Sequence, residues 1–271
     1  MGMLYNRLLI ILNEESAHST YYHIALSMLK HCEELSSMSI DRLAKLCNVS
    51  KSTISKFIRF IGYEDFADFK YASIFQADKY GYRMSYVNDV MKYMEHHSLE
   101  SFILAITQDI GASFMKLDWE KVNQLVSDIV RYDKIAAFGL LFSETAALDL
   151  QTKLAYNKKF IVTNQNDLKQ DQYIANADED TLIIIFSDSG KFIDRYQKIG
   201  DFAQKQTFAK TKAKVVVITS NKELEQDPRV SYCICYQKTT DLCTHRVVYG
   251  VLTDIIAYKY REYMKRTGAD M

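Results

Sequence analysis

The chain has 271 residues, of which 48% are hydrophobic and 25% are charged, with a single proline. This composition excludes a disordered or fibrous protein and predicts about two globular domains. Its 34 basic residues balance 34 acidic ones, so any affinity for nucleic acid must be local. No apolar run reaches the roughly 20 residues of a membrane helix, and Leu8–Leu12 is too short for a signal-peptide core. Five irregularly spaced cysteines favour a reducing compartment, and we expect a cytoplasmic protein.

The first part of the chain predicts an all-α domain. From Ser19 to about Ile110, apolar residues recur every three or four positions, the period of amphipathic helices. The helices expected after the first one are Ile40–Leu46, Lys51–Ile61 and Asp65–Gln76. We assign residues 1–79 to this domain and the polar, aromatic segment 80–97 to a linker.

The stretch from Ser37 to Tyr63 predicts a helix-turn-helix unit. Ser39 can cap a short helix, Asn48 tolerates the left-handed backbone of a tight corner, and Ser50 can cap the second helix. Apolar residues of the second helix form one buried stripe, so its polar and basic residues face outward. Such residues meet base edges and phosphates in the major groove. The predicted DNA-contacting residues are Ser50, Lys51, Ser52, Thr53, Ser55, Lys56 and Arg59.

Local charge agrees with DNA binding, but the charge of the whole domain does not. Residues 39–63 hold five basic residues against one acid, whereas residues 1–80 hold nine of each. The alternative is a helical hairpin with a solvated basic face. The small polar residues at the start of the second helix favour DNA recognition.

The second part, residues 98–271, predicts an α/β domain. Apolar runs without polar alternation are separated by helical stretches, the pattern of a parallel sheet covered on both faces. The expected strands lie in Lys134–Gly139, Lys159–Thr163, Thr181–Ser187, Lys214–Ser220 and Val230–Tyr236. We therefore predict a doubly wound, mainly parallel five-stranded sheet.

Two of its strand ends carry residues suited to an anion. Hydroxyls, glycines and free backbone N–H groups at strand-to-helix junctions bind phosphates. The predicted effector-binding residues are Gly139 and Ser143 at the first junction, and Ser187, Ser189, Gly190 and Lys191 at the second. The alternative is that the serines only cap helices.

The helix-turn-helix stretch resembles the N-terminal domain of the RpiR family of bacterial transcriptional regulators. The matching residues are Ser39, Leu43, Ala44, Val49, Ser50, Thr53, Lys56, Gly62, Phe66, Phe69 and Lys70. The family's second domain is a SIS (sugar isomerase) domain, with a Gly-x-Gly-x-Ser turn and a Ser-x-Ser-Gly-x-Thr phosphate loop that the two junctions resemble. Here Leu141 replaces the second glycine and Phe192 replaces the threonine.

The resemblance implies a regulator whose DNA binding responds to a sugar phosphate or related phosphorylated carbohydrate. We expect a homodimer or homotetramer on a pseudo-palindromic operator in double-stranded DNA. One alternative is a sugar-phosphate isomerase, for which Glu144 and His245 are the candidate bases. The other is a regulator whose effector site has decayed. We expect no metal site, because Cys233 and Cys235 are badly spaced for zinc on a strand. We also expect no cofactor, and no enzymatic activity because a helix-turn-helix has no use in a stand-alone isomerase.

Overall fold

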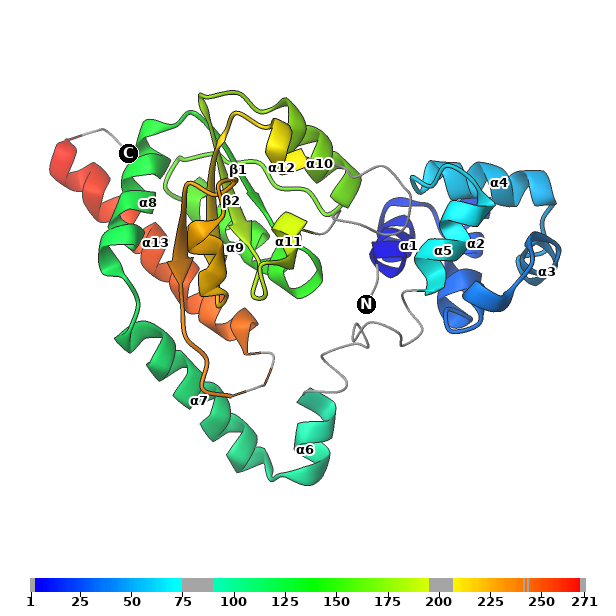
Figure 1. Cartoon of the computed structure of the whole chain (residues 1–271), viewed down its shortest axis with the longest axis horizontal. Coiled ribbons are helices and arrows are strands. Elements are labelled where there is room, and N and C mark those ends of the chain that lie inside the picture. The colour runs from blue at the N-terminus through cyan, green and yellow to red at the C-terminus, as the bar shows by residue number, and fades with distance from the viewer. Residues whose placement is uncertain (1–2, 75–89, 195–206, 241, 243, 269–271) are drawn as a thin grey trace. The chain divides into compact units, whose positions relative to one another are not determined.

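A computed structural model describes residues 3–74, 90–194, 207–240, 242 and 244–268 (Figure 1). The chain divides into two compact units, one formed by Met1–Tyr93 with Asn166–Leu168 and the other by Met94–Gln165 with Lys169–Met271. Most of the predicted linker, residues 80–89, lies outside the described residues, and its last part contains the short helix α6. The linker stays a prediction.

The first unit is helical, as predicted. Its helices are α1 (Met3–Glu14), α2 (Thr20–Lys30), the short 3-10 helix η1 (Leu35–Ser37), α3 (Ile40–Leu46), α4 (Lys51–Phe60) and α5 (Phe66–Ile74). One apolar core joins them, in which Leu8 of α1 and Met28 of α2 are fully buried together with Leu43 of α3 and Phe57 of α4. This core fixes the angle between α3 and α4.

The second unit is built on a parallel sheet. Its strands are β1 (Lys134–Phe138), β2 (Thr181–Phe186), β3 (Lys214–Thr219) and β4 (Tyr232–Cys235), in the order β1-β2-β3-β4. Its helices are α6 (Lys92–His96), α7 (Leu99–Met115), α8 (Trp119–Arg131), η3 (Leu141–Ser143), α9 (Glu144–Ala155), α10 (Asp167–Asn176), α11 (Lys191–Asp194), α12 (Thr207–Lys210), η4 (Lys222–Gln226) and α13 (His245–Thr267). No helix within the described residues is long and apolar enough to cross a membrane.

The prediction of five strands is wrong in one element. The run Lys159–Thr163 forms only an isolated bridge, in which Val162 lies opposite Ala136 of β1. Val162 accepts a hydrogen bond from the Ala137 backbone and donates one to the Ile135 carbonyl, both at 2.8 Å. Phe160 and Val162 are 74% and 46% exposed. Since only Ile161 of this run packs into the core, the run buries too little surface to extend the sheet.

Helices cover both faces of the sheet. Side chains on one face of the strands pack with α8, α9 and α13, whereas those on the other face pack with α10, α11 and α12. Ala136 pairs with Val162 on one side and with Ile183 of β2 on the other. The chain therefore runs from β1 first to one side and then to the other. Ligands of doubly wound sheets bind beyond the strand ends at such a switch point. In this sheet the switch point lies beyond the ends of β1 and β2.

Candidate functional site

The α3–turn–α4 segment has the local structure predicted for a helix-turn-helix. The Ser39 hydroxyl accepts a hydrogen bond from the Arg42 backbone at 3.2 Å, and the Ser50 hydroxyl accepts one from the Thr53 backbone at 3.1 Å. Asn48, in the turn, has a φ of 52°, the left-handed conformation that asparagine tolerates better than most residues. Both caps and the corner therefore stop one helix and start the next.

The predicted DNA-contacting residues share the outward side of α4. Ile54, Phe57 and Ile58 are fully buried beneath them. The residues Lys51, Ser52, Lys56 and Arg59 are exposed, and Thr53 and Ser55 are half-buried. This face therefore offers three hydroxyls and a row of cations along one helix.

Two features pre-order the start of this face. The Ser50 hydroxyl lies 2.8 Å from that of Ser52 and 2.9 Å from that of Thr53. Lys51 Nζ lies 2.5 Å from Asp41 of α3, so a DNA phosphate would compete with a carboxylate for this cation. Because both partners are exposed, that ion pair costs little to exchange.

In the second unit, the loop after β1 is tightly folded around Gly139. A Cβ on Gly139 would lie 2.5 Å from the Ser143 backbone, so only glycine fits there. Leu141, which stands where the SIS pattern has its second glycine, has a φ of 54°. The loop therefore keeps the left-handed backbone that favours glycine, although a leucine occupies the position.

The predicted serines differ in what their hydroxyls contact. Ser143 is buried and makes no side-chain cap to α9, and its hydroxyl instead interacts with the Tyr249 hydroxyl. Ser187 is also buried and accepts a hydrogen bond from the Phe192 backbone at 3.3 Å. Ser189 is exposed. The capping alternative therefore fits Ser187 but not Ser143.

The remaining residues of the second loop have distinct structural roles. Gly190 has a φ of 77°, and a Cβ there would lie 2.7 Å from Leu224. Lys191 is exposed. Phe192 is only 3% exposed and packs edge-on against Phe208, with ring centroids 5.9 Å apart. The position that is threonine in the SIS pattern thus belongs to the core here.

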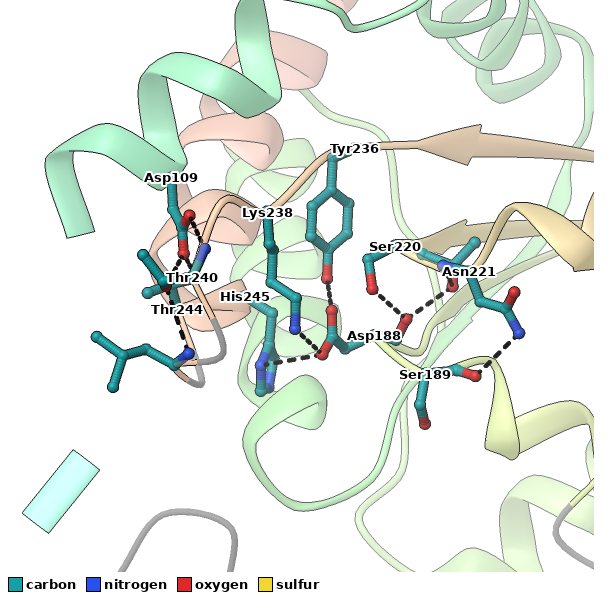
Figure 2. Close-up of polar contacts among 12 residues, drawn as sticks. Asp109, Asp188, Ser189, Ser220, Asn221, Tyr236, Lys238, Thr240, Thr244 and His245 are labelled. Atoms are coloured by element: carbon teal, nitrogen blue, oxygen red, sulfur yellow. Dashed lines mark hydrogen bonds and ion pairs between the residues drawn. The ribbon is translucent and has the colours of Figure 1, made fainter. Parts of the chain in front are cut away.

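Sequence reasoning missed the charged centre of the second loop, Asp188. Its carboxylate accepts hydrogen bonds from the Tyr236 hydroxyl and from Lys238 Nζ, the latter at 2.7 Å, and lies 3.9 Å from His245 Nδ1 (Figure 2). Its backbone oxygen accepts from the Ser220 hydroxyl at 2.9 Å. The only sequence signal for Asp188 was its place between two predicted serines, and the side chains that contact its carboxylate lie 48 to 57 residues further along the chain.

These contacts connect the two predicted loops. The Tyr249 hydroxyl interacts with Ser143 and lies 3.4 Å from the Tyr236 hydroxyl, which in turn donates to Asp188. Tyr236 comes from the end of β4, and Tyr249 comes from α13. A buried chain of hydroxyls therefore joins the loop after β1 to the loop after β2.

The charge states of this cluster follow from its surroundings. Burial raises the pKa of the Asp188 carboxyl, but Lys238, the Tyr236 hydroxyl and His245 outweigh that effect and leave the pKa below its usual value. Burial lowers the pKa of His245, and Lys238 and Arg246 add to this effect while Asp188 opposes it. At neutral pH the cluster therefore combines a carboxylate, an ammonium group and a neutral imidazole.

The loop that carries Lys238 is anchored by a second buried acid, Asp109 of α7. Its oxygens accept from the Thr239 and Thr240 backbones at 2.6 and 3.0 Å and from the hydroxyls of Thr239, Thr240 and Thr244 at 2.6 to 2.7 Å. Figure 2 shows the contacts with Thr240 and Thr244. Asp109 is fully buried. It therefore holds Thr239, Thr240 and Thr244 in place between Lys238 and His245.

The geometry of the two units defines a class of protein: a helix-turn-helix domain in one chain with a parallel α/β domain. The family described as "Helix-turn-helix domain, rpiR family" matches residues 8–76. The chain thus carries a helix-turn-helix domain of the rpiR family, and the resemblance predicted from its sequence is confirmed for that part.

Two curated relatives extend over more of the chain. An "Uncharacterized HTH-type transcriptional regulator in aarA 3'region" of Providencia stuartii is 25% identical over 72% of this chain and 68% of its own length. The "HTH-type transcriptional regulator HexR" of Escherichia coli is 24% identical over 84% of this chain and 81% of its own length.

The solved structures that match this chain have low sequence identity to it. The NanR protein of Vibrio vulnificus in complex with ManNAc-6P is 14% identical, with a TM-score of 0.48, over 98% of this chain and 96% of that chain. The sugar isomerase domain of an RpiR transcription factor from Sphaerobacter thermophilus is 15% identical, with a TM-score of 0.42, over 64% of this chain and 99% of that chain.

Proposed function

We propose that this protein is a cytoplasmic transcriptional regulator whose DNA binding is modulated by a sugar phosphate or related phosphorylated carbohydrate. The observation that carries the proposal is the presence, in one chain, of an rpiR-family helix-turn-helix and of two serine-bearing loops at the switch point of a parallel sheet. Both curated relatives are named as transcriptional regulators.

In this proposal α4 is the recognition helix. Ser52 and Thr53, at its start, meet base edges, whereas Arg59, two turns later, meets a phosphate. Ser50, Ser55, Lys51 and Lys56 complete the contacted face. Since one chain carries one such helix, two copies would read the halves of a pseudo-palindrome roughly 34 Å apart or a multiple of that distance.

The effector would bind beyond the ends of β1 and β2. Ser143, Ser187 and Ser189 would supply hydroxyls, Gly139 and Gly190 would allow close approach of the backbone, and Lys191 would supply charge. An effector that binds the DNA-competent and DNA-incompetent arrangements unequally would shift the population between them.

A homodimer or homotetramer is part of the proposal. The polar residues Asp109 and Ser113 of α7 are buried, while Leu99, Ile103 and Leu104 are 57% to 63% exposed. A helix that turns its apolar side outward is unfavourable in water unless another surface covers it. We propose that a second copy of the chain does so, because residues 101–108 carry no charge that would meet its own copy across a twofold axis.

The domain organisation is proposed as it was predicted, with DNA binding in residues 1–79, a linker over 80–97 and effector sensing in 98–271. An isomerase remains the second candidate because burial raises the pKa of Glu144, against the effect of a hydrogen bond with Gln165. A carboxyl of that kind, at the first residue of α9, is better matched to proton transfer near neutral pH than an ordinary one.

A mobility-shift experiment tests the proposal. The purified full chain is titrated onto the promoter region beside its own gene at two salt concentrations, with and without a mixture of sugar phosphates. We expect specific binding that the mixture changes. Specific binding that no sugar phosphate alters would favour a decayed effector site. Isomerisation of a sugar phosphate that is lost in Glu144→Gln would favour the enzyme instead.

A further inference from the structure

His245 presents an unpartnered nitrogen to the proposed effector site. It is the first residue of α13, its side chain is 9% exposed, and its Nδ1 atom has no hydrogen-bond partner among the described residues. A buried polar atom without a partner carries an uncompensated desolvation penalty, so such atoms are rare in native proteins. The Nδ1 atom therefore calls for a partner from outside the described residues.

The surroundings of this nitrogen are rigid. The imidazole lies edge-on to Tyr249, with ring centroids 5.7 Å apart. Asp188 is held by Tyr236 and Lys238, and its backbone oxygen is bound as well. Because both groups are fixed, the 3.9 Å between His245 Nδ1 and Asp188 Oδ2 is a distance that the pair cannot easily close by itself.

That gap has the size of one hydroxyl oxygen. An oxygen that forms hydrogen bonds of about 2.8 Å to both atoms fits across a separation of 3.9 Å. A hydroxyl group can donate a hydrogen bond to the carboxylate while it accepts one from a neutral imidazole N–H. Alternatively, it can donate to the imidazole nitrogen and form its other hydrogen bond with a second polar group. The Asp188 and Lys238 side chains are 20% and 22% exposed, so solvent reaches the ion pair.

We propose that His245 and Asp188 form a hydroxyl-recognition subsite that binds the polyol part of the effector, beside the serine loops that bind its anionic group. Lys238 keeps the carboxylate ionised and in place. The inference rests on the proposed function, because it assigns a second contact to the same effector. It predicts selection among phosphorylated compounds by their hydroxyls, so that inorganic phosphate binds far more weakly than a sugar phosphate.

Three variants of His245 separate the subsite from a structural role. In His245→Asn an amide atom stands near the position of Nδ1, in His245→Gln it stands near that of Nε2, and His245→Phe keeps a ring against Tyr249 without any nitrogen. Calorimetric titrations of the full chain use inorganic phosphate, glucose 6-phosphate, fructose 6-phosphate and ribose 5-phosphate as probes. Thermal unfolding shows first which variants are folded.

We expect His245→Phe and His245→Gln to lower the affinity for the best-binding sugar phosphate roughly tenfold. The affinity for inorganic phosphate should stay within about twofold of that of the unaltered protein. His245→Asn should restore most of the affinity. Ser143→Ala should weaken the binding of both the sugar phosphates and inorganic phosphate. Equal affinities for sugar phosphate in the unaltered protein and in the three His245 variants would overturn the subsite. The partner of the His245 nitrogen would then be a bound water.

A second measurement distinguishes failure of the subsite from failure of the proposed function. The ring nitrogens of His245 are followed by NMR during titration with unphosphorylated glucose and ribose at high concentration. If no sugar phosphate binds but the sugars shift the His245 signal, the proposed effector class is wrong and the subsite stands. If neither class of compound moves the signal or binds, the subsite is overturned.

Discussion

Replacing Asp109 with alanine should destabilise the second unit and loosen the loop that carries Lys238. The carboxylate accepts five hydrogen bonds, two of them from the backbones of Thr239 and Thr240. The three threonine hydroxyls can turn to other acceptors, but the two amides cannot. At about 1–3 kcal/mol for each amide left without a partner, and allowing for partial exposure of the loop, the expected loss is about 2–4 kcal/mol.

The assay is unfolding followed by the fluorescence of Trp119, the only tryptophan in the chain. It begins α8 and stacks on Phe114 of α7, with ring centroids 6.4 Å apart, so it reports on the unit that contains Asp109. For a domain of this size the midpoint should fall by roughly 5–15 °C. Thr107→Ala on the same helix is the control, because its hydroxyl bonds only to the Ile103 carbonyl.

The pH dependence provides an independent check. Burial would raise the pKa of Asp109, but hydrogen bonds from Thr240, Thr244 and Thr239 outweigh it and lower the pKa. An acid with a lowered folded pKa stabilises the protein above its unfolded pKa, about 3.9, and loses this effect as the pH falls through the folded value. The deficit of Asp109→Asn should therefore be complete at pH 7 and shrink below about pH 4. Equal midpoints for Asp109→Ala and Thr107→Ala would refute the reasoning.

Substitutions at five positions test three other parts of the molecule. Arg59→Ala should weaken binding to specific and scrambled duplexes alike and lower the slope of log affinity against log salt by about 1. Thr53→Ala should instead reduce the difference in affinity between the specific and the scrambled duplex. Gly139→Ala should destabilise the second unit by about 1–3 kcal/mol, because the added Cβ would lie 2.5 Å from the Ser143 backbone. Leu141→Gly should lower the stability by less than about 1 kcal/mol, since glycine relieves the positive φ at this position. Equal losses in chemical denaturation would contradict this account of the loop. Leu104→Asp should lower the oligomer mass in light scattering, and an unchanged mass would remove α7 from the interface.

The helix-turn-helix was predictable because its signals are local. Ser39 and Ser50 cap helices within three residues of themselves, and Asn48 sets the corner through its own backbone angle. Four strands were also predictable, because their continuous apolar runs are buried on both faces. The run at Lys159–Thr163 has the same composition but lies at the sheet edge, and the apolar pattern alone does not distinguish the two situations.

The candidate effector site was only half predictable. Its serines lie in short motifs that can be read along the chain, but Asp188 acquires its partners from the end of β4 and the start of α13. Which residues meet there depends on the parallel order of the strands, a tertiary property. The burial of polar residues of α7 was not predictable for the same reason. Asp109 is buried only because the loop at Thr239 and Thr240 folds onto it.

The departures from the phosphate-loop pattern change where selectivity must come from. Phe192 places a core side chain where a hydroxyl would bind phosphate, and the ammonium of Lys238 is already engaged by Asp188. A phosphate entering this loop therefore meets a neutralised ion pair, and its attraction depends on the serines and Lys191. Because the charge available to the anion is small, the hydroxyls beside His245 must contribute more of the affinity. We therefore expect an effector that is distinguished by its polyol part.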